Sequence, residues 1–143
     1  MDIKKIVRKL VKKHGCLDPF KLAAALDVTI LYKPLGNTLG FFVRYKRQKV
    51  IVLNESCPES LLPFVMAHEL GHAVLHPKVN TPFLKGHTLF SVDKIEREAN
   101  TFAVELLLPD ELLINQECCI SSVARCQGIP DGMELLKIYS ERK

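Results

Sequence analysis

The stretch PFVMAHELGHAVLH, residues 63–76, places a small group of polar side chains in a segment that is otherwise apolar. A helix that is apolar on all sides is typical of a core element. His68, Glu69 and His72 would then be buried, and burying imidazoles and a carboxylate without partners is costly. The stretch therefore predicts a central helix, which we place at 58–75, with a polar site inside the core.

The spacing of these polar residues indicates a metal site. His68 and His72 are four residues apart, so both imidazoles project from one helix face. Two nitrogens on one face can bind one ion at about 2.0–2.1 Å, and the HExxH pattern is typical of zinc peptidases. Glu69 is placed to exchange a proton with water and the leaving amine. Because HExxH fixes only three positions, a helix with two metal-free histidines is the alternative.

A catalytic zinc ion needs a third protein ligand, and His76, His87, Glu96 and Glu98 are the candidates. A helix predicted over residues 92–108 separates the two glutamates. At about 100° per residue, its apolar residues form one arc. This arc consists of Ile95, Ala99, Phe102, Ala103, Leu106 and Leu107. Glu96 falls inside the arc and Glu98 outside it, so we predict Glu96 as the ligand and keep Glu98 as the alternative.

Three further residues are assigned supporting roles. Asn100 lies one turn after Glu96 and is expected to hydrogen-bond a ligand histidine, which would hold its tautomer. His76 does not fit the longer HExxHxxGxxH spacing, so we expect it to cap the helix or support the site. His87 falls in a predicted loop over residues 77–92, where it is expected to be exposed, with a role in polarising substrate left open.

The remaining patterns predict the fold class. Helices are expected at 3–13, 19–26, 58–75 and 92–108, strands at 28–33, 39–45 and 49–53, and short helices between 110 and 143. Because strands and helices occupy separate parts of the chain, we predict an α+β fold. We expect a small three-stranded antiparallel sheet packed on a zincin-like helical core with a short helical C-terminal tail. The chain is interpreted as a single domain, 1–143, with a catalytic core at 1–112 and a tail at 113–143.

Composition excludes several classes of protein. No apolar run approaches the roughly 18 residues of a membrane span, and no secretory signal is recognisable, so a cytoplasmic protein is expected. The five cysteines form no CxxC pair and are interpreted as free thiols; they are Cys16, Cys57, Cys118, Cys119 and Cys126. The net charge of +4 comes mainly from basic clusters in residues 1–13 and 44–49. We interpret both as solvated surfaces, so direct nucleic-acid binding is not expected.

Two stretches together carry a family resemblance. HELGHAVLH, residues 68–76, followed by IEREANTFAVELLLP, residues 95–109, resembles the ImmA/IrrE family of zinc-dependent metallopeptidases. The E-x-x-A-N-x-F-A core and the closing L-L-x-P of the second stretch are the more specific part, and the resemblance covers about residues 1–112. It implies a gluzincin-type site with His68, His72 and Glu96 on Zn²⁺ and Glu69 as acid–base. It also implies a protein substrate, a helix-turn-helix transcriptional repressor of a phage, mobile-element or stress switch.

These observations favour a metallopeptidase but leave its details open. The oxyanion of the reaction needs a further donor, for which Tyr32, Tyr45, His87 and Arg97 are all candidates. The strand at 39–45 is a candidate for binding an extended peptide at its edge. One alternative is a non-catalytic zinc-containing module that sequesters a repressor. A second alternative is a DNA-binding regulator that uses the basic N-terminal helix.

Overall fold

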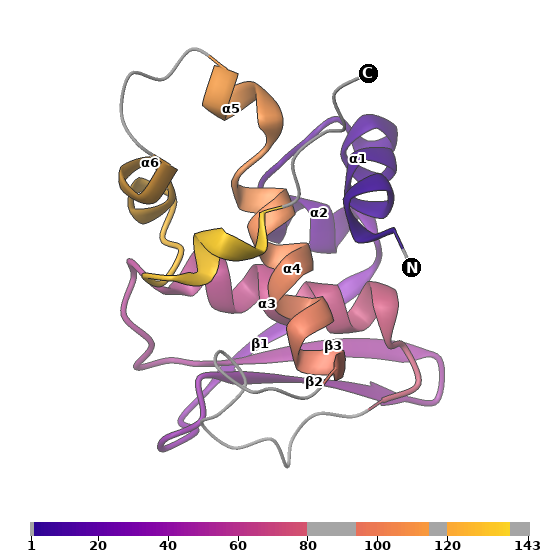
Figure 1. Ribbon diagram of the computed structural model, residues 1–143. Coiled ribbons are helices and arrows are strands. Elements are labelled where there is room, and N and C mark those ends of the chain that lie inside the picture. The colour runs from indigo at the N-terminus through magenta and orange to yellow at the C-terminus, as the bar shows by residue number, and fades with distance from the viewer. Residues whose placement is uncertain (1, 80–93, 115–119, 138–143) are drawn as a thin grey trace.

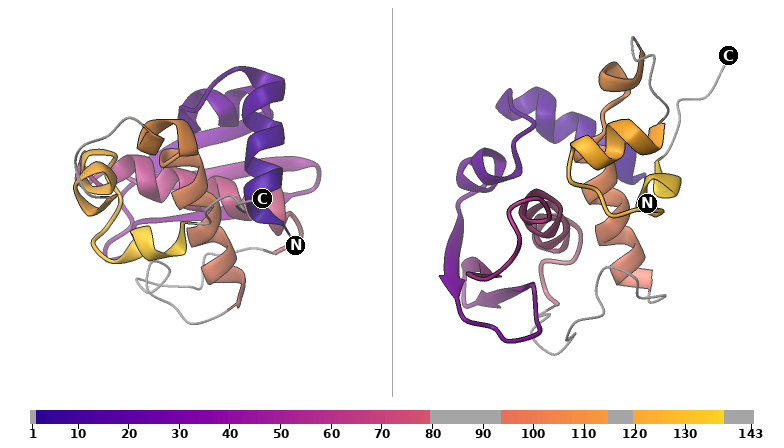
Figure 2. Two further views of the ribbon diagram at one scale, coloured as in Figure 1. Left: turned by 45° about the horizontal axis from the view of Figure 1, so that its top comes forward. Right: turned by 90° about the vertical axis from the view of Figure 1, so that its left-hand side faces the viewer.

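The computed structural model describes residues 2–79, 94–114 and 120–137 of the chain. Its elements are α1 (Ile3–His14), α2 (Pro19–Ala25), β1 (Val28–Lys33), β2 (Gly40–Tyr45), β3 (Gln48–Asn54), α3 (Leu62–Leu75), α4 (Lys94–Leu107), α5 (Asp110–Ile114), α6 (Ile120–Cys126) and the short 3₁₀ helix η2 (Met133–Leu136). Figure 1 shows α3 lying over the sheet with α4 crossing it, and Figure 2 shows α3 end-on between the sheet and α4. The predicted α+β class is confirmed.

Local signals define the first two helices as expected. Asp2 caps α1 by accepting a hydrogen bond from the Lys5 backbone N–H at 3.1 Å. Gly15 ends the helix in the left-handed region, with a φ of 70°, and its N–H donates to the Val11 carbonyl. Asp18 caps α2, which starts with a proline in its first turn.

The sheet is mixed, with the strand order β1-β3-β2, so the prediction of an antiparallel sheet was wrong for one of its two pairings. β2 and β3 pair antiparallel through a tight hairpin in which Tyr45 lies opposite Gln48 and Lys46 has a positive φ of 58°. β1 pairs parallel with β3, with Ile30 opposite Ile51.

The connection between β1 and β2 explains this order. Asn54, at the end of β3, donates from its side-chain amide to the carbonyls of Gly36 and Thr38, both at 2.9 Å. These bonds hold residues 34–39 against the end of β3, so β2 lies on the far side of β3 from β1. β3 becomes the central strand, which suits its continuous apolar run at residues 50–53.

The helix that carries HExxH starts later than predicted but is buried as expected. Residues 58–61 form a turn, and α3 begins at Leu62 with Pro63 in its first turn. Because proline lacks an N–H and clashes with the preceding turn, it is tolerated at a helix start and not further inside. Every residue of the stretch 64–73 is buried, with the sheet on one side and α4 on the other.

A glycine allows α3 and α4 to pack closely. A Cβ placed on Gly71 would lie 3.1 Å from Phe102 Cβ and 3.2 Å from the Ala99 carbonyl oxygen. Both distances are shorter than an ordinary van der Waals contact, so only glycine fits here without movement of α4. The close crossing brings the first two turns of α4 against the face of α3 that carries His68 and His72.

The predicted helical tail is confirmed as far as the described residues extend. α5, α6 and η2 follow α4 in short succession, and η2 returns to pack on α4. Cys16, Cys57 and Cys126 are free thiols, as expected, whereas His87, Cys118 and Cys119 lie outside the described residues. None of the described helices is both long and apolar enough to cross a membrane.

Candidate metal centre

Three of the predicted site residues meet in the core between α3 and α4. His68 Nε2 lies 3.0 Å from Glu96 Oε1, and His72 Nε2 lies 3.3 Å from the same oxygen. The potential ligand atoms of His68, His72 and Glu96 all lie within 4.8 Å of one another, and all three residues are buried. In the part of the chain that the structure describes, no other group of three such residues comes together in this way.

The partner of His68 determines which of its nitrogens faces the centre as an acceptor. His68 Nδ1 lies 2.7 Å from Asn100 Oδ1. Because an amide oxygen only accepts hydrogen bonds, Nδ1 carries the proton, and neutral His68 has its lone pair on Nε2. That lone pair points toward the Glu96 carboxylate, an arrangement that favours a cation between them. The contact that the sequence predicted for Asn100 is therefore present.

The carboxylate of Glu96 is also incompletely partnered. Its Oε2 atom lies 3.2 Å from His72 Nε2, yet it is buried and has no hydrogen-bond partner among the described residues. A buried carboxylate oxygen without a partner is costly unless a cation compensates it. Two imidazole nitrogens and one carboxylate oxygen form a donor set that suits zinc. The residues therefore fit a divalent metal ion such as zinc.

Burial and their mutual contacts shift the pKa of each of the three residues. Burial acts to raise the pKa of Glu96, but its hydrogen bonds with His68 and His72 outweigh this and lower the pKa to about 2. Burial acts to lower the pKa of His68, but the bond to Glu96 and the charge of Glu69 raise it overall. Burial lowers the pKa of His72, and its histidine neighbours add to this effect. The site thus favours one positive charge beside an ionised Glu96.

Glu69 and Glu98 lie at different places around these three residues. Glu69 is buried on α3, with 1% of its surface exposed, close enough to His68 to raise its pKa electrostatically. Glu98, the alternative ligand, instead contacts His76, with 2.8 Å between Oε1 and Nε2. His76 in turn places Nδ1 3.1 Å from His72 Nδ1. The predicted role of His76 as a helix cap is confirmed, because His76 is the C-cap of α3. The sequence did not predict that His72, His76 and Glu98 contact one another in series, although the spacing of four residues between the two histidines was a visible signal.

The candidate oxyanion donors are not brought together. Tyr32 on β1 is 50% exposed, and Tyr45, at the end of β2, is 70% exposed and lies beside the Lys46 ammonium group. Arg97 is exposed on α4, one residue after Glu96. The choice among the three therefore stays open, and the fourth candidate, His87, lies outside the described residues.

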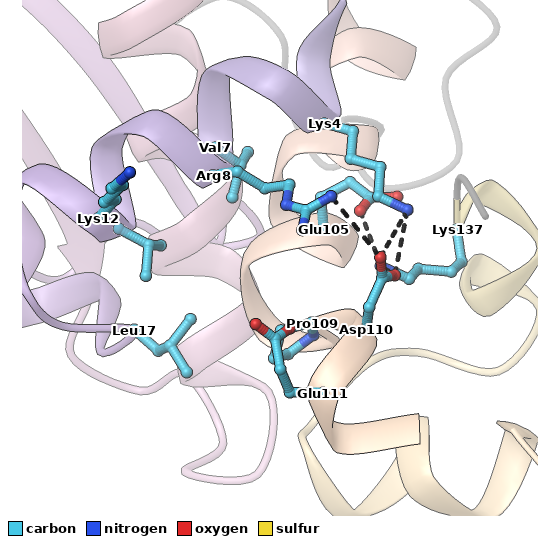
Figure 3. A pocket seen from close by; sticks show the side chains of 11 residues that line it. Lys4, Val7, Arg8, Lys12, Leu17, Glu105, Pro109, Asp110, Glu111 and Lys137 are labelled. Carbon is cyan, nitrogen blue, oxygen red and sulfur yellow. Dashed lines mark hydrogen bonds and ion pairs between the residues drawn. The ribbon is translucent and has the colours of Figure 1, made fainter. Parts of the chain in front are cut away.

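A separate cavity of about 590 Å³ lies between α1 and the start of α5. Figure 3 shows its charged rim, where Lys4, Arg8, Glu105 and Lys137 gather around Asp110. Its lining shares no residue with the His68–His72–Glu96 group. The cavity is therefore distinct from the candidate metal centre.

Comparison with known proteins identifies a family and two relatives of this chain. The IrrE N-terminal-like domain, a peptidase family, matches residues 23–117. Immunity region protein 2 of Bacillus phage phi105, itself uncharacterized, is 45% identical over 145 residues, which cover 99% of this chain and 92% of the phage protein. Metallopeptidase ImmA of Bacillus subtilis (strain 168) is 34% identical over 113 residues, which cover 78% of this chain and 66% of that enzyme. No solved structure matches the chain.

Proposed function

The chain belongs to the IrrE N-terminal-like family of peptidases, and from this premise we propose that it is a zinc-dependent metalloendopeptidase with its active site at His68, Glu69, His72 and Glu96. The observation that carries the proposal is the convergence of two imidazole nitrogens on a buried carboxylate whose Oε2 has no hydrogen-bond partner among the described residues. In this proposal His68, His72 and Glu96 hold the zinc ion, and the domain follows a zincin-like plan within residues 1–112.

The chemistry is divided between the ion and Glu69. A bound zinc ion supplies a Lewis acid that lowers the pKa of water and polarises a peptide carbonyl. The Glu69 carboxylate takes a proton from the attacking water and passes it to the nitrogen of the leaving amine. Its burial beside His68 keeps bulk water away from this proton transfer. Asn100 holds the tautomer of His68 that leaves Nε2 free to bind the ion.

The edge strand β2 is the proposed binding site for the substrate backbone. It pairs with β3 on one side only, so its outer edge is free of strand partners within the described residues. Its first residue, Gly40, packs on Val65, three residues before His68; a Cβ at Gly40 would lie 3.2 Å from Val65 Cγ1. An extended peptide that pairs with this edge would therefore run beside the helix that carries the site.

We propose a helix-turn-helix transcriptional repressor as the substrate. Two observations support this choice, namely the family resemblance and the 45% identity to a protein of a phage immunity region. A repressor substrate places the reaction in the cytoplasm. Incubation of the purified chain with such a repressor, with and without a chelator, should give discrete fragments only when zinc is present. An intact repressor under all conditions would contradict cleavage.

Glu69→Gln distinguishes an enzyme from a module that only sequesters the repressor. We expect the variant to keep zinc and to cleave about 10²–10⁴-fold more slowly, because the amide cannot accept the proton. A sequestering module would act equally well without Glu69. Glu59→Gln, at an exposed position before α3, is the matched control and should cleave at the wild-type rate. Cleavage by Glu69→Gln at the wild-type rate would exclude the mechanism.

A further inference from the structure

His72, His76 and Glu98 contact one another in series on the side of His72 that faces away from Glu96. His76 closes the last turn of α3, and its backbone N–H donates to the His72 carbonyl at 2.8 Å. Its side chain therefore lies one turn after His72 on the same face, with 3.1 Å between the two Nδ1 atoms. On its other side, His76 Nε2 lies 2.8 Å from Glu98 Oε1. These contacts join the end of α3 to the second turn of α4.

The Glu98 carboxylate determines which nitrogens of His76 and His72 carry protons. Ionised Glu98 only accepts hydrogen bonds, so His76 carries a proton on Nε2 and, when neutral, has its lone pair on Nδ1. Two Nδ1 atoms at 3.1 Å need one proton between them, and this proton then belongs to His72. His72 is left with its lone pair on Nε2, the nitrogen that faces Glu96.

Burial makes this arrangement effective. The side chains of His76 and Glu98 are 7% and 17% exposed, so water competes little for their hydrogen bonds. Bonds that end on an ionised acceptor are among the stronger ones in proteins. The two histidines of the centre thus have different supports, a neutral amide from Asn100 behind His68 and an imidazole–carboxylate pair behind His72.

We propose that His76 and Glu98 are positioning residues that hold His72 in the tautomer and orientation needed to bind the metal ion. This inference rests on the proposed metal site. Its chemical content is that His76 Nδ1 accepts the His72 Nδ1–H proton, while Glu98 keeps His76 in the accepting tautomer. Partners of this kind orient a ligand histidine and increase its basicity, and their loss typically lowers metal affinity about 10–100-fold.

The test measures zinc affinity by competition with a chromophoric chelator. His76→Phe keeps a ring but removes the acceptor, and we expect it to bind zinc about 10–100-fold more weakly. His76→Gln offers an amide oxygen that can accept from His72 Nδ1, so it should recover most of the lost affinity. Glu98→Leu removes the terminal carboxylate and should cause a smaller loss. The matched controls are His14→Phe and Glu59→Leu, on α1 and before α3, which should bind zinc like the wild type.

Two further readouts separate positioning from structural support. The visible absorption bands of the protein loaded with Co²⁺ should shift in His76→Phe and not in the two controls, because the orientation of a ligand changes. The melting temperature of the metal-free protein should change little in His76→Gln and Glu98→Leu. If His76→Phe does not fold, these two milder variants decide the question through the same affinity measurement.

Zinc affinity and metal-free stability together distinguish a positioning role from a structural one and test the proposed metal site. Equal zinc affinity for wild type, His76→Phe and Glu98→Leu would overturn the positioning role and leave the proposed peptidase intact. Lower stability of the metal-free variants with unchanged affinity would make the contact structural and would also overturn it. Failure of the wild-type protein to bind zinc would remove the proposed function itself.

Discussion

The two ends of α4 hold buried carboxylates in opposite circumstances. Near its start, Glu96 meets two imidazoles, and its Oε2 has no hydrogen-bond partner in the described parts of the chain. Near its end, Glu105 lies 2.8 Å from the ammonium group of Lys137, which also lies 2.9 Å from Asp110. Lys4 completes that cluster at 3.0 Å from Asp110 (Figure 3).

The comparison contrasts a charge cluster that is balanced by its own side chains with the candidate metal centre. At the Glu105 end, Glu105 and Asp110 are paired with lysines of the same chain, so the buried charges balance one another. Because Lys4 lies on α1 and Lys137 follows η2, these ion pairs also connect α1 and the tail to the end of α4. At the Glu96 end, the groups nearest the carboxylate among the described residues are the imidazoles of His68 and His72. Neither carries a permanent charge as a lysine does, so a bound metal ion could supply the positive charge there. A buried carboxylate that lacks its own cation therefore indicates a metal site more strongly than burial alone does.

The largest expected effect comes from removing the Glu96 carboxylate near the start of α4. Glu96→Gln should weaken zinc binding at least about 100-fold, because loss of a ligand exceeds the loss expected for a supporting partner. Zinc should then no longer raise the melting temperature, as it should for the wild type. Glu105→Gln is the control at the other end and should bind zinc normally. Normal zinc binding by Glu96→Gln would remove Glu96 from the ligand set.

Breaking the cluster at the other end should affect stability and not metal binding. Lys137→Met leaves Glu105 and Asp110 without their shared cation, and Lys137 and Glu105 are nearly fully buried. We expect a loss of about 3 kcal/mol in the free energy of unfolding, measured by urea denaturation. Zinc affinity should stay at the wild-type value. A large fall in affinity would show that the two ends of α4 are coupled.

Acid should act on the Glu96 end in a defined pH window. The pKa of Glu96 is lowered from 4.5 to about 2, so its ionised form stabilises the folded state. This contribution is fully present above the unfolded pKa and is lost as the pH falls through about 2. In the metal-free protein we expect a loss of about 3 kcal/mol over this window. Glu96→Gln, measured alongside, should lack this component; identical pH profiles would contradict the assignment.

The smallest expected effect comes from widening the close crossing of α3 and α4 at Gly71. Gly71→Ala places a methyl group against Phe102 and the Ala99 carbonyl, so α4 must move away by a few tenths of an ångström. We expect a loss of about 1 kcal/mol in the free energy of unfolding and a modest fall in zinc affinity. Gly36→Ala is not a suitable control because Gly36 has a φ of 61°. Ala25→Gly, at an exposed position at the end of α2, is the control and should leave zinc affinity at the wild-type value.

Much of the candidate site could be predicted because it depends on helical periodicity. The interval between His68 and His72 and the place of Glu96 in an apolar arc both follow from about 100° per residue. The sheet was harder, because pairing depends on contacts between distant segments. Nothing in the strand patterns shows that Asn54 holds the loop before β2 and so places β3 in the centre.

The sequence by itself determined which residues can bind a metal ion, since side-chain chemistry and helical spacing are local properties. Only the tertiary structure decided the environment of each charge. Glu96 and Glu105 both lie on α4, yet one meets two histidines of α3 and the other a lysine 32 residues later in the chain. Likewise, Glu98 contacts His76 because α3 and α4 cross closely at Gly71. Whether a buried carboxylate meets a cationic side chain depends on which segments pack together, and packing is a property of the whole fold.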